Sequence, residues 1–407
     1  MSQIPFGHLF LQIAVILIAC RICGFVMRRV GQPAVIGEMI AGVVLGPSLL
    51  GLLAPEFSGW LFMPASKPIL HEIAQIGLAL YMFTVGLEFR TDLLAAKARS
   101  AVAVSVAGMA APFAIGALIS LPLTKAGGFY GEGISHGMAA VFTGAAMCVT
   151  AFPMLARIIR ERGLASTPAG TLSLAAGSLD DVAAWVLLAG VVGLAQGTPI
   201  LVVWTLLGAA AYVIVCRLVV PRVFKNGIEN SETLFRKLGL LLVFLSLGAW
   251  FTDQIRLYAV FGAFLVGAFV PRGALSEYAV KKITPLTTLF LLPVFFTYSG
   301  LNTQIQLIDS PQDWMFTALI IVGAVAGKLG ACYAASRLCG QGHSDALTVA
   351  SLMNARGLME LIMLNIGLQA GLITPRLFSV MVIMAIVTTL MAAPLFELAR
   401  RSARSAN

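Results

Sequence analysis

Charged residues are scarce in this chain. Asp, Glu, Lys and Arg make up 11% of its 407 residues, whereas soluble domains carry about 25%. Apolar residues make up 59%, and the mean hydropathy is +0.93. This composition excludes a soluble globular protein and is typical of a polytopic membrane protein.

Metal-ligating and nucleophilic side chains are also scarce. The four histidines lie near the ends of apolar segments and form no cluster with metal-ligand spacing. Cys20 and Cys23 form a C-x-x-C inside an apolar run, without the second ligand pair that a zinc site requires. Because no nucleophile–base set is evident, we expect neither an enzyme nor a cofactor. The net charge of +9 is better explained by cytoplasmic loops than by binding to nucleic acid.

Thirteen apolar runs have the length of a membrane span. They cover residues 8–27, 33–51, 69–87, 100–121, 137–158, 168–195, 199–219, 236–253, 257–271, 283–301, 313–336, 343–369 and 376–397. Arg28 and Arg29 follow the first run where a signal peptide would have a small-residue cleavage site, so we expect a span there. The sequence therefore predicts an all-α polytopic membrane protein with thirteen transmembrane helices.

The basic residues alternate between loops. Twenty lie in the odd-numbered loops and the C-terminal tail, and four lie in the even-numbered loops: Lys67, Lys125, Arg256 and Arg376. Since cytoplasmic loops carry the excess of Lys and Arg, this pattern predicts an outside N-terminus and a cytoplasmic C-terminus. We expect a multi-pass protein of a bacterial inner membrane.

Two pairs of spans are similar in sequence. AVIGEMIAGVVLGP (34–47) resembles AVFGAFLVGAFVPR (259–272), and MFTVGLEF (82–89) resembles FTYSGLNT (296–303). Because seven spans separate the equivalent helices, the repeats must be inverted across the membrane, as is typical of secondary transporters. We expect one membrane transporter domain, with repeat one at 1–197, a linker helix at 198–222, repeat two at 231–400, and no soluble regulatory domain in this chain.

Two spans that correspond under this repeat are interrupted in mid-run. One contains Thr150-Ala151-Phe152-Pro153, and the other contains Asn354-Ala355-Arg356-Gly357. Pro153 removes a backbone donor and biases Phe152 away from the helical conformation. Two broken helices that cross would leave half-helix ends of both signs near the bilayer centre. We expect the transport site at this crossing.

Ionisable residues are expected at the same depth: Asp180, Asp181, Lys328, Arg356, Glu360 and Glu38. An ionised carboxylate at the bilayer centre costs about 2.5–3.5 kcal/mol on insertion scales, so the adjacent aspartates indicate function. Neighbouring helical residues point about 100° apart, so one aspartate can meet Lys328 while the other faces a cavity. Arg356 could pair with Glu360, four residues further on, or with Glu38. The surplus carboxylate, beside free carbonyls, suits a monovalent cation or a proton.

These motifs carry a family resemblance. CVTAFPMLARIIRERGL (148–164) and SLDDVAAW (178–185) resemble the broken-helix and aspartate motifs of the monovalent cation:proton antiporter superfamily. IGEMIAGVVLGPSLLG (36–51), LPVFFTYSGL (292–301), Lys328 and NARGLMELIMLNIGLQAGLIT (354–374) fit the same pattern, so the resemblance covers nearly the whole chain. The most similar branch holds KefC-like transporters and plant cation/proton exchangers. That branch usually has Asn where this chain has Asp180, whereas two aspartates with a membrane Lys resemble electrogenic sodium/proton exchangers.

The resemblance implies a sodium/proton antiporter-like fold and a homodimer, in which a mobile core domain moves like an elevator against a dimerisation domain. It implies that Asp181 binds the cation and the proton, that Asp180 pairs with Lys328, and that the break around Thr150 lines the site. The predicted function is exchange of Na+ or K+ for H+, with competition at Asp181. An ion channel or ligand-gated potassium efflux pore, and a sodium-coupled organic-anion symporter, are alternatives. The expected partners are these ions, the bilayer and a second copy of the chain, with no nucleic acid.

Overall fold

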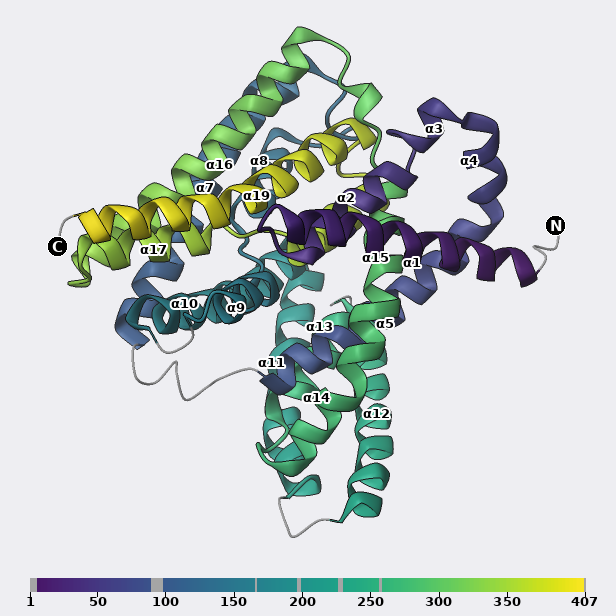
Figure 1. The fold of residues 1–407 in the computed structure, drawn as a ribbon, viewed down its shortest axis with the longest axis vertical. Helices are drawn as coiled ribbons and strands as arrows, with labels where there is room; N and C mark the ends of the chain where they lie inside the picture. The colour runs from purple at the N-terminus through teal and green to yellow at the C-terminus, as the bar shows by residue number, and fades with distance from the viewer. Residues whose placement is uncertain are drawn as a thin grey trace.

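The computed structural model describes residues 6–88, 98–164, 167–195, 199–225, 230–255 and 258–405. In these ranges all elements are helical, apart from an isolated β-bridge between Tyr130 and Ile373 (Figure 1). The longer helices are α1 (Phe6–Arg29), α2 (Ala34–Leu45), α5 (Lys67–Glu88), α7 (Ala98–Ala126), α10 (Pro168–Ala195), α11 (Pro199–Val223), α12 (Ser231–Gln254), α16 (Pro311–Leu338) and α19 (Pro375–Ser405). The shorter ones are α3 (Leu50–Leu53), α4 (Pro55–Leu61), α8 (His136–Cys148), α9 (Phe152–Glu161), α13 (Ala259–Phe269), α14 (Ala274–Leu286), α15 (Leu292–Leu301), η3 (Ile305–Leu307), α17 (His343–Met353) and α18 (Leu358–Gln369).

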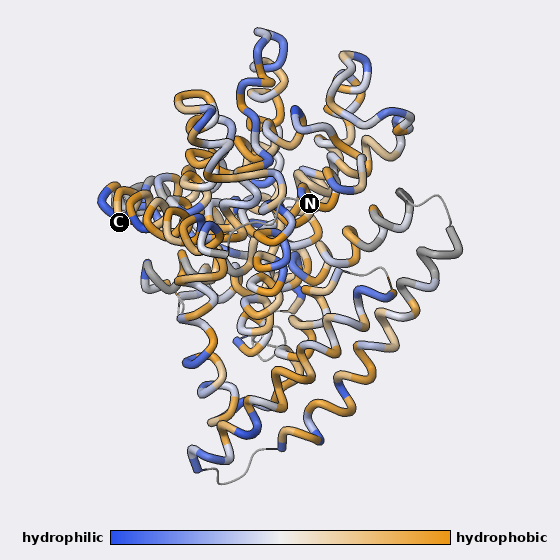
Figure 2. The backbone as a smooth tube through the Cα atoms, turned by 90° about the vertical axis from the view of Figure 1, so that its right-hand side faces the viewer, coloured by the Kyte–Doolittle hydropathy of each residue, from blue (hydrophilic) through white to orange (hydrophobic). Residues whose placement is uncertain are grey.

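The helices have the length and composition of membrane spans. Ten helical stretches within the described residues can cross a bilayer, and α8 and α13 are shorter apolar helices. Figure 2 shows hydrophobic residues along most of the helices. Each predicted run overlaps at least one helix, which confirms the all-α membrane fold, while the count of thirteen spans stays a prediction. Arg90 and Lys97, two of the basic residues counted in the odd-numbered loops, lie outside the described residues, as do Arg256 and the predicted repeat boundary at 197–198.

The helices form two groups. The scaffold group comprises α1–α5, α11–α15 and η3, and it lies at the bottom and right of Figure 1. The core group comprises α7–α10 and α16–α19 and lies at the upper left. Within the scaffold group α2 packs on α1 and α15, and α13 packs on α5 and α12; within the core group α7 packs on α8 and α16. The two groups meet mainly where α10 contacts α11 and where α19 contacts α2 and η3.

Glycines allow the scaffold helices to approach closely, and they do so in equivalent pairs. A β-carbon on Gly42 of α2 would collide with the backbone of Phe296 in α15, where Gly300 also lies against Gly42. A β-carbon on Gly267 of α13 would collide with the backbone of Phe83 in α5, near Gly86. The predicted repeat aligns Gly42 with Gly267 and Gly86 with Gly300, so the two contacts are equivalent.

A second pair of close glycine contacts also lies at equivalent positions of the repeat. Gly37 of α2 lies against the backbone of Cys23 and Gly24 in α1. Gly262, its equivalent in α13, lies against the backbone of Gly248 in α12. Because glycine has no side chain, it lets helices in a membrane approach closely, and van der Waals contact then holds them together. The matched contacts support the predicted inverted repeat.

Candidate ion-binding site

Two interrupted helices cross in the core group. α8 ends at Cys148, the chain is extended at Val149, and α9 begins at Phe152. The Ala151 amide donates a hydrogen bond to the Ala355 carbonyl at 3.1 Å, which joins this interruption to the one between α17 and α18. Phe152, which we expected to lie outside the helix, instead begins α9. Pro153 is tolerated next to it because the first turn of a helix needs no intrahelical N–H donors.

Glycine and α19 shape the second interruption. Gly357 has φ 151° and ψ −114°, a conformation that is essentially restricted to glycine. The Asn354 amide group donates to the Thr388 carbonyl at 3.2 Å. The Thr389 hydroxyl donates to the Arg356 carbonyl at 2.9 Å and lies 3.2 Å from the Arg356 amide. The sequence analysis did not predict these hydrogen bonds. The feature that could have indicated them is the pair of threonines, Thr388 and Thr389, in an apolar run.

Asp180 of α10 is fully buried, and three side chains donate hydrogen bonds to it. The Ser105 hydroxyl donates to Oδ1 at 2.6 Å. The Thr150 hydroxyl donates to Oδ2 at 2.6 Å, and Lys328 Nζ lies 2.9 Å from the same oxygen. Thr150 and Lys328 were expected here, whereas Ser105 of α7 was not. One positive charge and two hydroxyl groups therefore occupy both oxygens of the Asp180 carboxylate.

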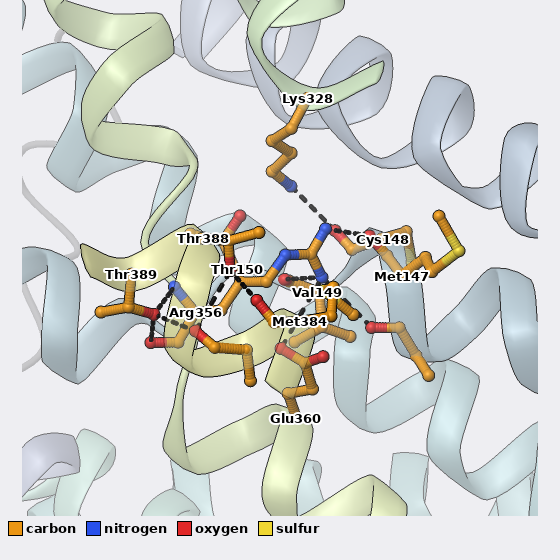
Figure 3. Close-up of polar contacts among 12 residues, drawn as sticks. Met147, Cys148, Val149, Thr150, Lys328, Arg356, Glu360, Met384, Thr388 and Thr389 are labelled. Carbon is orange, nitrogen blue, oxygen red and sulfur yellow. Dashed lines mark hydrogen bonds and ion pairs between the residues drawn. The ribbon is translucent and has the colours of Figure 1, made fainter. Parts of the chain in front are cut away.

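Lys328 also closes the end of a half-helix. Its Nζ donates to the Cys148 carbonyl at 2.8 Å, at the C-terminus of α8 (Figure 3). The carbonyls that end a helix carry partial negative charge, so a lysine is well placed there. Lys328 is 1% exposed and comes from α16, so this contact ties α16 to the crossing.

Asp181 has a different environment from its neighbour. It is fully buried, and its Oδ1 accepts a long hydrogen bond of 3.4 Å from the Phe152 amide at the N-terminus of α9. Its Oδ2 has no hydrogen-bond partner among the described residues. A helix N-terminus favours a negative charge or a bound anion, but one long bond leaves most of the carboxylate's capacity free.

Arg356 lies beside the same half-helix end. Its guanidinium group donates to the carbonyls of Ala146 at 3.3 Å and Val149 at 3.5 Å, and to that of Met147 (Figure 3). Of its two proposed carboxylate partners, Glu360, in the first turn of α18, lies 3.8 Å away. Neither Glu360 oxygen has a hydrogen-bond partner among the described residues.

The buried charges of this cluster do not balance. Its carboxylates are those of Asp180, Asp181 and Glu360, and its basic groups are those of Lys328 and Arg356. Each of these residues is at most 1% exposed. An uncompensated charge is costly in a buried site, so three carboxylates and two basic groups leave room for one positive charge. A monovalent cation or a proton would supply it.

Comparisons with known proteins assign the chain to a family. Residues 14–398 match the family described as sodium/hydrogen exchanger, transmembrane. The chain belongs to this family. It is 39% identical to the Na(+)/H(+) antiporter NhaS4 of Synechocystis, over 94% of this chain and 95% of that protein. It is 35% identical to cation/H(+) antiporter 17 of Arabidopsis thaliana over 95% of this chain, which spans about half (48%) of that relative.

A solved structure shows the same fold. The sodium proton antiporter MjNhaP1 from Methanocaldococcus jannaschii matches with a TM-score of 0.68 at 14% identity. The match covers 97% of both chains. The likeness therefore includes both helix groups of this exchanger-family protein.

A cavity of about 400 Å³ lies between the two groups of this exchanger-family protein. Its walls come mainly from α1, α2, α5, α14 and α15 of the scaffold group, and it reaches Phe152 and Ala156 of α9. Phe152 is the residue whose amide contacts Asp181. Glu38, the other carboxylate proposed for Arg356, lines this cavity instead. The cavity therefore extends to the helix end that contacts the less saturated aspartate.

A wide helical turn forms part of the cavity wall. Thr287–Leu291 adopts a π-helix between α14 and α15. Pro293 lies in the first turn of α15 and has no amide hydrogen to donate to the preceding turn, which accounts for the disturbed ladder. Thr288, Leu289 and Pro293 all line the cavity. Sequence reasoning missed this feature, although Pro293 was visible in the predicted span.

Proposed function

We propose that the chain exchanges a monovalent cation, Na+ or K+, for protons across the membrane, and that Asp181 binds the cation and the proton in turn. The contrast between the adjacent aspartates carries this proposal. Asp180 has three donors at 2.6–2.9 Å, whereas Asp181 has one at 3.4 Å. The carboxylate with unused capacity is the one that can exchange its partner. Membership of the sodium/hydrogen exchanger family supports the same reading.

Competition for one site is sufficient for exchange. The cluster lacks one positive charge, so it is neutral with either a cation or a proton bound. The empty cluster carries a net negative charge, which is costly to move through an apolar environment. Core movement is therefore favoured when the site is loaded with one ion or the other. This couples the two fluxes without a separate device.

We further propose that alternating access is an elevator movement of the core group. Asp180, Asp181, Lys328 and Arg356 all come from the core group, so they move as one unit. The scaffold group supplies most of the cavity wall but none of this cluster. Backbone packing between the groups is mainly that of α10 on α11 and of α19 on α2 and η3, which supports relative movement.

The membrane setting of the proposal follows the charge pattern. Arg28 and Glu88, at the ends of α1 and α5, line the cavity. The predicted positive-inside pattern assigns both ends to the cytoplasmic side, so the cavity opens inward in this conformation. A homodimer and a bacterial inner membrane complete the proposal, and both rest on the family resemblance. Mass measurement of the detergent-solubilised protein tests the dimer.

Exchange in proteoliposomes tests the proposal. A pH-sensitive dye inside the vesicles should report proton movement on addition of Na+, K+ or Li+, across a range of pH values. Asp181→Asn should abolish this response, whereas Asp253→Asn, an exposed aspartate at the end of α12, should not. Normal exchange by Asp181→Asn would show the assignment to be wrong. Cation flux with no fixed proton ratio would favour a channel.

A further inference from the structure

Two cavities meet at Glu38. The larger, of about 400 Å³, is the one that reaches Phe152. The smaller, of about 30 Å³, reaches Met154 and Leu358. Met154 is in the first turn of α9, and Leu358 begins α18, so the smaller cavity extends to the crossing. Both cavities are lined by Glu38, Tyr81 and Thr288, which therefore separate the larger space from the smaller.

Glu38 differs from the other charged residues of the cavity walls. Among the described residues, Arg21, Arg28 and Glu88 line the larger cavity alone, whereas Glu38 lines both. A volume of about 30 Å³ holds a water molecule or a small cation, but not a hydrated ion. An ion that crosses from the larger cavity to the smaller must lose part of its hydration shell at this point.

The residues at this boundary can replace lost water ligands. Glu38 offers a carboxylate, and Tyr81 and Thr288 bear hydroxyl groups. Hard cations are coordinated by carboxylate, hydroxyl and carbonyl oxygens. Glu38 is half-buried on α2, a scaffold helix, so it stays behind when the core group moves. It can therefore serve one face of the membrane only.

We propose that Glu38 is an access site for the transported cation. It binds the monovalent cation as the ion leaves the larger cavity, and it passes the ion through the smaller cavity toward Asp181. This inference rests on the proposed function, because it assigns a step on the path to the same site. It also predicts an asymmetry: Glu38 serves transport from the face with the larger cavity and not from the opposite face.

Sided exchange kinetics test this inference. In oriented vesicles, Glu38→Gln should raise the cation KM at the face with the larger cavity about tenfold, equal to about 1.4 kcal/mol of lost attraction, with the maximal rate within roughly twofold. The KM at the opposite face should not change. Glu88→Gln is the matched control, because Glu88 lines the larger cavity alone. Glu38→Asp keeps the charge and should give an intermediate KM.

Three results would overturn the inference. They are an unchanged KM in Glu38→Gln, an equal rise at both faces, and an equal rise in Glu88→Gln. If Glu38→Gln does not fold, Glu38→Asp decides, and a KM equal to the unmodified protein's at the cavity face then overturns the inference. Normal exchange by Asp181→Asn would contradict the proposed function, whereas an inactive Asp181→Asn with an unchanged KM in Glu38→Gln would contradict this inference alone.

Discussion

Removing the charge of Lys328 should destabilise the protein strongly. Lys328→Met keeps most of the length of the side chain but removes the ion pair with Asp180 at 2.9 Å and the hydrogen bond to the Cys148 carbonyl at 2.8 Å. Both side chains are at most 1% exposed, so solvent cannot compensate the remaining carboxylate. Breaking a buried ion pair on one side costs about 3–5 kcal/mol. At an unfolding entropy of about 2.1 cal/mol/K per residue, this lowers the unfolding midpoint by about 4–6 °C for 407 residues.

The matched double variant separates charge from packing. In Asp180→Asn with Lys328→Met, both charges are gone, and the Ser105 and Thr150 hydroxyls still have an oxygen to which they can donate. Replacing both members of a buried pair is often close to neutral. We therefore expect the double variant to regain most of the stability that Lys328→Met loses.

Thermal unfolding of four proteins measures this effect. The unmodified protein, the two single variants and the double variant are heated in one detergent at one scan rate, because midpoints of irreversible unfolding depend on the rate. A midpoint of Lys328→Met within about 1 °C of the unmodified protein would refute the reasoning, because surface changes of about 0.5 kcal/mol shift the midpoint by about 0.6 °C. A double variant less stable than Lys328→Met would also refute it.

Four further variants, two of them with a matched control, test the crossing and the scaffold. Thr150→Val should lower the free energy of unfolding by about 1.5–3 kcal/mol by removing a donor to a buried carboxylate, and Thr150→Ser should not, as thermal unfolding would show. Gly357→Ala should cost about 1–3 kcal/mol because of its positive φ, whereas Gly330→Ala, in open space in α16, should cost nothing. Gly42→Val and Gly267→Val should both abolish the folded peak in size-exclusion chromatography, and a folded peak from either would contradict the close packing.

The helices and their interruptions could be predicted because their signals are local. Apolar runs of membrane length indicate spans whatever lies around them. Pro153 and the Asn354–Gly357 segment mark the two interruptions within such runs. Helix ends were less predictable: the run predicted at 33–51 contains α2, which ends at Leu45, and only the start of the separate helix α3 (Leu50–Leu53). Glycine, proline and polar residues between these helices are tolerated in a long apolar run, so hydropathy does not place the boundary.

The charged part of the site and Thr150 could also be predicted, whereas the hydroxyl groups of Ser105 and Thr389 could not. Asp180, Asp181 and Lys328 are conspicuous because ionised residues are rare in apolar runs. Ser105 and Thr389 are not, because serine and threonine in membrane helices often bond to their own backbone, as Thr388 does to the Met384 carbonyl at 2.8 Å. Which hydroxyl meets a carboxylate depends on how the helices pack.

The position of Glu38 shows the same limit. Its expected depth in the membrane suggested an ion pair with Arg356, but the structure pairs Arg356 with Glu360 at 3.8 Å. Glu38 instead lines two cavities formed with α5, the π-helical turn and α15. A cavity depends on elements far apart in the chain, so no local pattern indicates it.

A cation and a proton should compete for Asp181. Calorimetric titration of the purified protein with NaCl and KCl tests this competition most directly, in buffers of different ionisation enthalpy and over a series of pH values. Each bound cation should release on the order of one proton at the pH values where the free site is protonated. In Asp181→Asn, the addition of Na+ or K+ should release no proton. Cation binding coupled to proton release in Asp181→Asn, at the level of the unmodified protein, would contradict the account.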